Sequence, residues 1–293
     1  MVNFCLQCGR EINTNAVLCD KCSTIYMMFS VPNLDKKYIH NKEEILQIKE
    51  ESGDKEQIIC NTGFYQFGLK SLRPPMIDKD NNTVIYDCLY FGEYPQFINS
   101  GKTRDPIKWR VLDIKGNKAF VIADICIDSR PFDIGYSENI WKYSSLRAWL
   151  NSFFYHLAFT YSEGEAILNT DLPDVNSSDK IFLLSYSEIC NEQYGFQSLA
   201  ECDDEMRYRG MSPYTIHNMN KENTLINSIN KRAWWLRTKG YDNDLVMAVL
   251  RSGKVYSYGW GAKSVGIGVC PALWINLDKT EVWKYAGDIQ IHL

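Results

Sequence analysis

SSLRAWLNSFFYHLAF, residues 144–159, has the clearest helical pattern in the chain. Its apolar residues recur every three or four positions, which places them on one face of an α-helix. Ser144 or Ser145 stands where this helix would begin, and a serine hydroxyl there accepts a hydrogen bond from the first turn. Because the apolar face carries large aromatic rings, we predict a helix at the centre of the hydrophobic core. That face consists of Leu146, Trp149, Leu150, Phe153, Phe154 and Leu157.

Segments with the composition of β-strands lie on both sides of this helix. Before it, residues 107–114 and 118–125 are separated by Gly116 and Asn117, which predicts a hairpin. After it, the turn sequence RSGK at 251–254 predicts a second hairpin. Strands that flank a helical middle predict an α+β fold. The expected strands cover residues 84–92, 107–114, 118–125, 180–185, 233–238, 244–250, 254–259 and 269–277.

Three further helices are predicted from capping boxes, in which a serine is followed three residues later by a glutamate. The pairs are Ser162 with Glu165, Ser185 with Glu188, and Ser198 with Glu201. Gly210 would end the last of these helices.

Two CxxC pairs near the start of the chain have the spacing of zinc ligands. Four thiolates fill the tetrahedral shell of one zinc ion and leave no place for water, so this zinc would be structural. The alternative is that these are ordinary buried or disulfide-forming cysteines. We predict one zinc per chain, bound by Cys5, Cys8, Cys19 and Cys22.

The chain is expected to have three parts. A zinc ribbon occupies residues 1–28, and residues 29–80 form a charged linker or extension in which a short helix could end near Gly53. The paired prolines Pro74 and Pro75 and the turn formers after them interrupt regular structure. The α+β body then covers residues 81–293.

The composition of the chain limits the kinds of partner and the cellular compartment that we expect. Apolar residues make up 45% of the chain, which is typical of a globular protein, and the net charge of −4 argues against binding through the nucleic-acid backbone. No run of eighteen apolar residues occurs, so we expect no membrane span. The other six cysteines lack the spacing of a disulfide framework, and we expect free thiols in a cytoplasmic protein. They are Cys60, Cys88, Cys126, Cys190, Cys202 and Cys270.

Six segments in order resemble a bacterial family of uncharacterised domains grouped with C-type-lectin-like and formylglycine-generating-enzyme-like folds. The resemblance covers roughly residues 84–277 and implies a lectin-like body with central helices flanked by antiparallel strands. Members are often preceded by a zinc ribbon. This chain departs from the family at Cys270, where an arginine is usual. The segments are LYFGEYPQ, PIKWRVLDI, SSLRAWLNSFFYHLAF, IFLLSYSEI, WWLRT and GVCPALWI.

The fold relatives implied by this resemblance include ligand binders and an oxidase. The oxidases use two cysteines close together in the C-terminal part of the domain, whereas Cys270 is the only cysteine after Cys202 here, which argues against that activity. No catalytic motif was found: the four histidines are far apart, and there is no nucleophile elbow or phosphate-binding loop. We therefore expect no catalytic residues, with the oxidase kept as the alternative.

The ligand-binding relatives use their C-terminal hairpin and loops for recognition, and residues 241–268 of this chain are rich in tyrosine, tryptophan, asparagine, serine and glycine. Rigid aromatic side chains on strands are typical of recognition surfaces. The alternative is that these residues pack against a second layer of the structure. We predict a non-catalytic binding module for an unknown protein or small ligand. An adaptor that binds nucleic acid or protein through the ribbon is a further alternative. The expected binding residues are Trp235, Arg237, Tyr241, Asp242, Tyr256, Tyr258 and Trp260.

Overall fold

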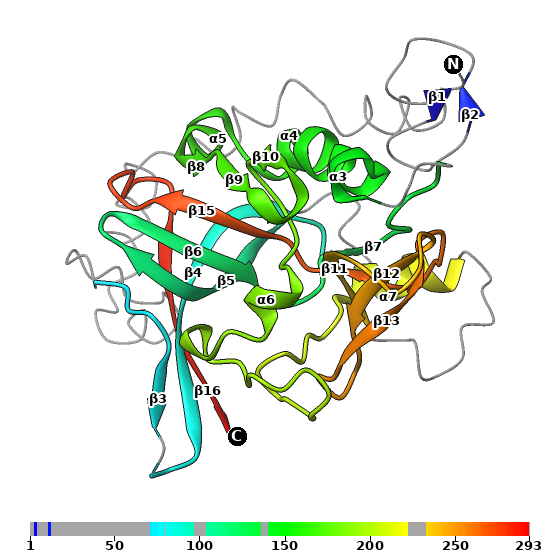
Figure 1. Ribbon diagram of the computed structural model, residues 1–293. Coiled ribbons are helices and arrows are strands. Elements are labelled where there is room, and N and C mark those ends of the chain that lie inside the picture. Colours follow the sequence, from blue (N-terminus) through cyan, green and yellow to red (C-terminus); the bar gives the residue numbers. More distant parts are fainter. Residues whose placement is uncertain are drawn as a thin grey trace. The chain divides into compact units, whose positions relative to one another are not determined.

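The fold is described from a computed structural model of the chain (Figure 1). It describes residues 3–4, 11–12, 71–78, 80–96, 104–135, 140–221 and 233–292. The chain divides into two compact units, Met1–Lys70 and Ser71–Leu293. In the first unit, β1 (Asn3–Phe4) pairs antiparallel with β2 (Glu11–Ile12). All further elements belong to the second unit.

A seven-stranded antiparallel sheet forms one part of the second unit. Its order is β16-β4-β5-β6-β15-β8, with β3 paired to β4. The predicted hairpin around Gly116 is confirmed, because Lys115 of β5 lies opposite Lys118 of β6 and Gly116 has a positive φ. The strands are β3 (Met76–Asp78), β4 (Thr83–Tyr94), β5 (Asp105–Lys115), β6 (Lys118–Ala123), β8 (Ile167–Leu168), β15 (Ala272–Asn276) and β16 (Lys284–His292).

A five-stranded sheet of order β13-β12-β11-β14-β7 forms a separate group of strands (Figure 1). The predicted turn at 251–254 is confirmed, because the Leu250 and Gly253 amides close it on the carbonyls of Lys254 and Leu250. The β11–β14 pair is parallel and the other pairs are antiparallel. The strands are β7 (Asp128–Ser129), β11 (Trp234–Lys239), β12 (Leu245–Val249), β13 (Val255–Gly261) and β14 (Gly268–Val269).

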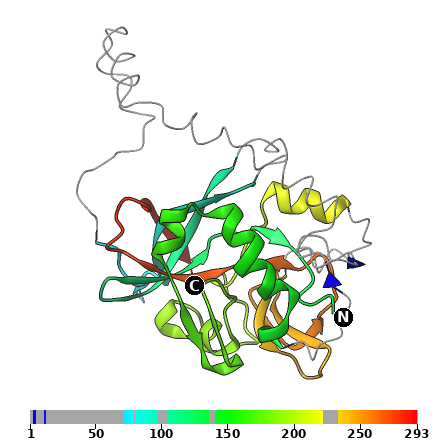
Figure 2. The ribbon, with the colours of Figure 1, turned by 90° about the horizontal axis from the view of Figure 1, so that it is seen from above.

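The helix predicted at 145–158 is confirmed, with a π-helical turn in its middle. It consists of α3 (Ser145–Trp149), the π-turn η3 (Leu150–Phe154) and α4 (Tyr155–Ala158), and the Ser144 hydroxyl caps its start. Figure 2 shows this continuous helical segment from above. Trp149 is 1% exposed, and its ring meets that of Tyr94 on β4 edge-on, with 6.5 Å between centroids. The aromatic face therefore packs into the core, as expected.

Shorter helical segments lie between β7 and β11 in the sequence. They are η2 (Trp141–Tyr143), α5 (Tyr161–Ala166), η4 (Pro173–Val175), α6 (Tyr186–Ile189), η5 (Glu192–Tyr194) and α7 (Pro213–Lys221). A small hairpin of β9 (Thr170–Leu172) and β10 (Ser177–Asp179) lies among them. The strand expected at 180–185 is reduced to a single β-bridge between Phe182 and Ala272. The described residues thus form a mixed α and β structure with more strand than helix.

One of the three predicted capping boxes is confirmed, at Ser185 and Glu188. The helix expected at Ser162 begins two residues earlier, with Thr160 and Glu163 as its capping box. Both pairs fit the capping pattern, and Thr160 is the residue that directly follows the extended Phe159, where the preceding helix ends.

The helix expected from Ser198 to Gly210 does not form. Its backbone instead wraps around the buried guanidinium of Arg207, which donates hydrogen bonds to the carbonyls of Leu199, Ala200 and Gly253. This tertiary contact overrides the local capping signal.

The second compact unit begins at Ser71, ten residues before the expected start of the body at residue 81. Within it, β3 pairs with β4 through Met76, Ile77 and Asp78. Two prolines just before this strand do not prevent the pairing, because β3 lies beside β4 off the main order of the sheet and its first pair is formed by Met76. None of the helices in the described residues has the length and hydrophobicity that a membrane-crossing segment needs.

Candidate functional site

Four aromatic rings form a continuous row on β13 and the turn before β12, which we call the aromatic row. Tyr241 and Tyr258 are stacked, with 5.4 Å between centroids and 11° between planes. Tyr256 links Tyr258, at 6.3 Å, to Trp260, at 5.4 Å. The alternation along β13 predicted that its three aromatic residues share a face, and these ring contacts confirm it.

The backbone of β12 and β13 explains why Tyr258 projects outward. From Tyr256 to Trp260 the chain advances four residues, while the partner strand advances two, from Ala248 to Val246. This bulge requires Gly259 to adopt a φ of +97°, which favours glycine. The additional residues of the bulged strand leave Tyr258 half exposed.

The turn at residues 240–244 holds Tyr241 against this bulge. The Tyr241 amide donates to the Tyr258 carbonyl at 2.9 Å, and the Leu245 amide donates to the Asp242 carbonyl at 3.1 Å. Tyr241 is 77% exposed and Tyr258 is 51% exposed, so the stacked pair presents apolar ring surface to solvent. Asp242, the next residue in the chain, has an exposed side chain. Backbone hydrogen bonds therefore position an exposed pair of rings.

The Trp260 end of the aromatic row is less exposed to solvent than the Tyr241 end. Trp260 is half buried, and its indole Nε1 is shielded from solvent without a hydrogen-bond partner among the described residues. Tyr256 is also half buried. A buried N–H without an acceptor is costly, so this end combines packing with an unsatisfied donor.

Two of the residues expected in the site lie elsewhere. Trp235 is completely buried, its indole Nε1 donates to the Arg130 carbonyl at 2.8 Å, and its ring packs against Phe132. Two consecutive tryptophans on a strand point to opposite faces, and here both faces are covered, because Trp234 is equally buried. Trp235 is therefore a core residue.

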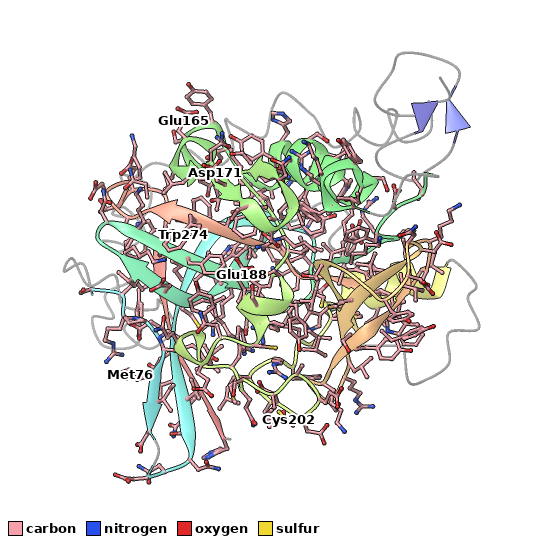
Figure 3. The ribbon with its side chains drawn as sticks, in the orientation of Figure 1. Met76, Glu165, Asp171, Glu188, Cys202 and Trp274 are labelled. Atoms are coloured by element: carbon pink, nitrogen blue, oxygen red, sulfur yellow. The ribbon has the colours of Figure 1, made fainter. Side chains whose placement is uncertain are left out.

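Arg237 is also buried, and its guanidinium binds two carboxylates. It donates to Asp174 Oδ2 at 2.9 Å and to Glu188 Oε2 at 2.5 Å. Although burial opposes the charged form, the hydrogen bonds to Glu188 and Asp174 raise the pKa of Arg237. Figure 3 labels Glu188, which lies on α6. Arg237 therefore joins β11 to the helical segments. The candidate site keeps five of the predicted residues: Tyr241, Asp242, Tyr256, Tyr258 and Trp260.

The predicted zinc ligands Cys5, Cys8, Cys19 and Cys22 lie outside the described residues. In the sequence, Cys5 and Cys8 fall between β1 and β2. Within the residues that are described, no cluster of three or more His, Cys, Asp or Glu side chains could hold a metal ion. The zinc site remains a prediction.

A buried cluster of two arginines and two cysteines was missed by the sequence analysis. Cys270 is buried close to Cys126, and its thiol donates a hydrogen bond to the Ala123 carbonyl at 3.2 Å. Burial alone would raise the pKa of Cys270, but the interaction with Cys126 and the nearby guanidiniums of Arg209 and Arg110 lower it. Burial and the interaction with Cys270 raise the pKa of Cys126. No motif could have revealed this cluster, because its members are far apart in the sequence.

One of the two positive charges of this cluster has no ion pair with a carboxylate among the described residues. Arg110 Nε pairs with Asp124 at 2.5 Å, whereas Arg209 Nη1 donates to the carbonyls of Met206 and Tyr208. Three nitrogens of these two arginines are buried without a geometric hydrogen bond to the described residues: Nη1 of Arg110, and Nε and Nη2 of Arg209. A thiolate at Cys270 would supply the missing negative charge.

Comparisons with known proteins identify a family without an assigned activity. Residues 116–277 match the family described as Domain of unknown function (DUF6273). The match includes the helix at 145–158, the aromatic row and Cys270. No curated protein and no solved structure is significantly similar to the chain.

Proposed function

We propose that this chain, which belongs to the DUF6273 family, is a non-catalytic binding module whose lectin-like body recognises a protein or a small ligand through the aromatic row. A structural zinc ribbon at residues 1–28 would tether this module to other components. The single observation that supports the proposal most strongly is the stacked, solvent-exposed pair of Tyr241 and Tyr258.

Physical chemistry favours recognition at this pair. An exposed tyrosine has little reason to be ordered, yet here the rings stack on each other and the backbone below them is hydrogen-bonded. Tyrosine loses little conformational entropy on binding because it has only two side-chain torsions. The row therefore offers preorganised contact area, and the exposed Asp242, next to Tyr241 in the chain, adds a hydrogen-bond acceptor.

The experiment probes arrays of glycans and of peptides with the full chain. The test variant is Tyr241→Ala/Tyr258→Ala, which truncates the two exposed rings. The control is Tyr143→Ala/Tyr161→Ala, because these tyrosines are also exposed, at 65% and 84%, and lie on other elements. The ligand bound by the wild type should be lost by the test variant and retained by the control, while thermal stability changes little in both.

Two outcomes would contradict the proposal. Retained binding in the test variant with unchanged stability would move the site elsewhere, most plausibly to the ribbon. A loss of more than about 1 kcal/mol in unfolding free energy would assign the two rings to the fold, because exposed substitutions cost less than about 0.5 kcal/mol.

The oxidase is a second candidate because the structure pairs two cysteines. Cys270 lacks a nearby cysteine in the sequence, but Cys126 is its neighbour in the fold. Cys126 precedes the helix at 145–158, however, whereas the oxidases carry both cysteines in the C-terminal part of the domain. Both thiols are also completely buried, and a protein substrate would have to reach a cysteine directly. This burial keeps the binding module as the favoured function.

A further inference from the structure

An open pocket of about 450 Å³ lies on the seven-stranded sheet, apart from the aromatic row. It is bounded by the hairpin of β5 and β6, by β15, and by the segment that joins β8 to β9. Figure 3 labels two of its residues, Trp274 on β15 and Asp171 on β9. Its volume is within the range of small-molecule sites. The residues that line it are Lys115, Lys118, Leu168, Asn169, Thr170, Asp171 and Trp274.

A rigid aromatic platform forms one wall of this pocket. Trp274 is stacked on Phe120, with 5.1 Å between centroids and 15° between planes. Phe120 is in turn stacked on Phe182 at 5.9 Å and 20°, and both phenylalanines are buried. Trp274 also pairs with Phe120 and Leu168 in the strand register. Ring stacking on Phe120 and the strand pairing of the Trp274 backbone therefore hold the indole in place without a ligand.

An exposed lysine ammonium also lies against this indole. Lys115 Nζ lies 5.3 Å from the centre of the Trp274 ring, and its side chain is 66% exposed. Its ion pair with Asp113 is long, at 3.4 Å. An exposed cation–π contact contributes only about 0.5–1 kcal/mol, so a flat ring could replace the ammonium on the indole at small cost. The lysine would then be free to pair with the ligand.

The charges and polar groups around the platform define the rest of the ligand. Lys115 and Lys118 face each other across the hairpin, and both side chains are exposed. Asp171 is the one carboxylate among the lining residues, so two lysines and one aspartate give the pocket a formal charge of +1. Asn169 and Thr170 add an amide and a hydroxyl. The pocket thus offers a π surface, cations for an anion, and acceptors for amino or hydroxyl groups.

From this combination we infer that the pocket binds a planar heteroaromatic ring that carries a phosphate, with nucleoside monophosphates as the simplest class. The ring would stack on Trp274, and Lys115 and Lys118 would hold the phosphate. A polynucleotide fits less well, because the pocket has only two lysines and the chain has a net charge of −4.

Isothermal titration of the full chain with the four common nucleoside monophosphates tests the inference. Adenosine and inorganic phosphate serve as probes that each lack half of the recognised group. We expect at least one monophosphate to bind about tenfold or more tightly than either partial probe. Lys115→Gln/Lys118→Gln should weaken binding by about tenfold or more, and both positions are exposed, so this variant should fold. The control Lys239→Gln/Lys254→Gln removes the same charge from the five-stranded sheet and its hairpin and should bind normally.

A second variant, Trp274→Leu, tests the platform, and its folding is checked by circular dichroism. Binding that is lost in the folded Trp274→Leu protein as well as in the lysine variant supports the inference. No binding of any monophosphate at millimolar concentration overturns it, and so does equal binding of adenosine and AMP. Tighter binding of a single-stranded oligonucleotide than of its mononucleotides would overturn it in favour of a nucleic-acid surface.

Discussion

Replacing Arg147 by alanine gives the sharpest test of how the helix at 145–158 is attached to the body. Arg147 lies outside the apolar face of this helix, and a surface arginine at such a position costs under about 0.5 kcal/mol when it is replaced. In the structure, its Nε and Nη2 both lie 2.6 Å from Asp179 Oδ1, and Nη1 donates to the Lys142 carbonyl at 2.9 Å. The Arg147 side chain is 29% exposed, whereas that of Asp179 is 1% exposed. The substitution would therefore leave a buried carboxylate without its cation.

The expected cost follows from what Asp179 retains. Breaking a fully buried ion pair by removing one partner costs about 3–5 kcal/mol. Here Asp179 Oδ2 still accepts hydrogen bonds from Trp141 Nε1 at 2.8 Å and from the Ser177 hydroxyl at 3.0 Å, and water can reach the space left by a partly exposed arginine. We expect Arg147→Ala to lower the free energy of unfolding by about 2–3 kcal/mol.

Chemical denaturation of a double-mutant cycle measures this quantity. Asp179→Asn keeps an oxygen for Trp141 and removes the charge, so Arg147→Ala should cost much less in the Asp179→Asn background, with a coupling energy of about 1.5–2 kcal/mol. The control Arg251→Ala is exposed and should cost under about 0.5 kcal/mol. An Arg147→Ala loss below about 0.5 kcal/mol would refute the reasoning. A large loss of stability in Arg147→Ala with no coupling to Asp179 would attribute that loss to the missing hydrogen bond with the Lys142 carbonyl.

Four other outcomes are expected. Trp149→Ala should lower the free energy of unfolding by about 3–5 kcal/mol, because its ring is buried among the aromatic residues of the core, and denaturation with unchanged far-ultraviolet dichroism checks this. Gly253→Ala should cost about 2 kcal/mol or more, since φ is +83° and a methyl group would collide with the Asp204 carbonyl; a cost below about 0.5 kcal/mol would contradict the described turn. Because the pKa of Cys270 is lowered from 9.0, the unfolded chain binds more protons below that value, so the wild type should gain stability over Cys270→Ala as pH rises towards 9.0, and a pH-independent difference would argue against a thiolate. Elemental analysis should find one zinc per chain, and removal of residues 1–30 should abolish it while the body keeps its cooperative thermal transition.

Local patterns alone determined much of the fold. The spacing of apolar residues predicted the helix at 145–158, and turn residues predicted the hairpins at Gly116 and Gly253. Alternation along β13 correctly placed Tyr256, Tyr258 and Trp260 on one face of the strand. Such features depend on residues close in the sequence, whose geometry follows from helix and strand periodicity.

Capping signals were less decisive than these patterns. The box at Ser185 forms a helix, whereas the one at Ser198 does not, because the buried guanidinium of Arg207, within the same segment, takes the carbonyls of Leu199 and Ala200. A capping pair contributes about 1 kcal/mol, which a buried guanidinium with several hydrogen bonds can override.

Only the tertiary structure decided which polar and aromatic residues are available for function. Trp235 and Arg237 are residue types that often occur in binding sites. In the structure, Trp235 is packed in the core, and the charge of Arg237 is neutralised by Asp174 and Glu188. The pair of Cys126 and Cys270 and the pocket at Trp274 likewise join segments that are distant in the sequence. The physical reason is that burial and ion pairing depend on which strands and helices meet, and local residue patterns do not specify those long-range contacts.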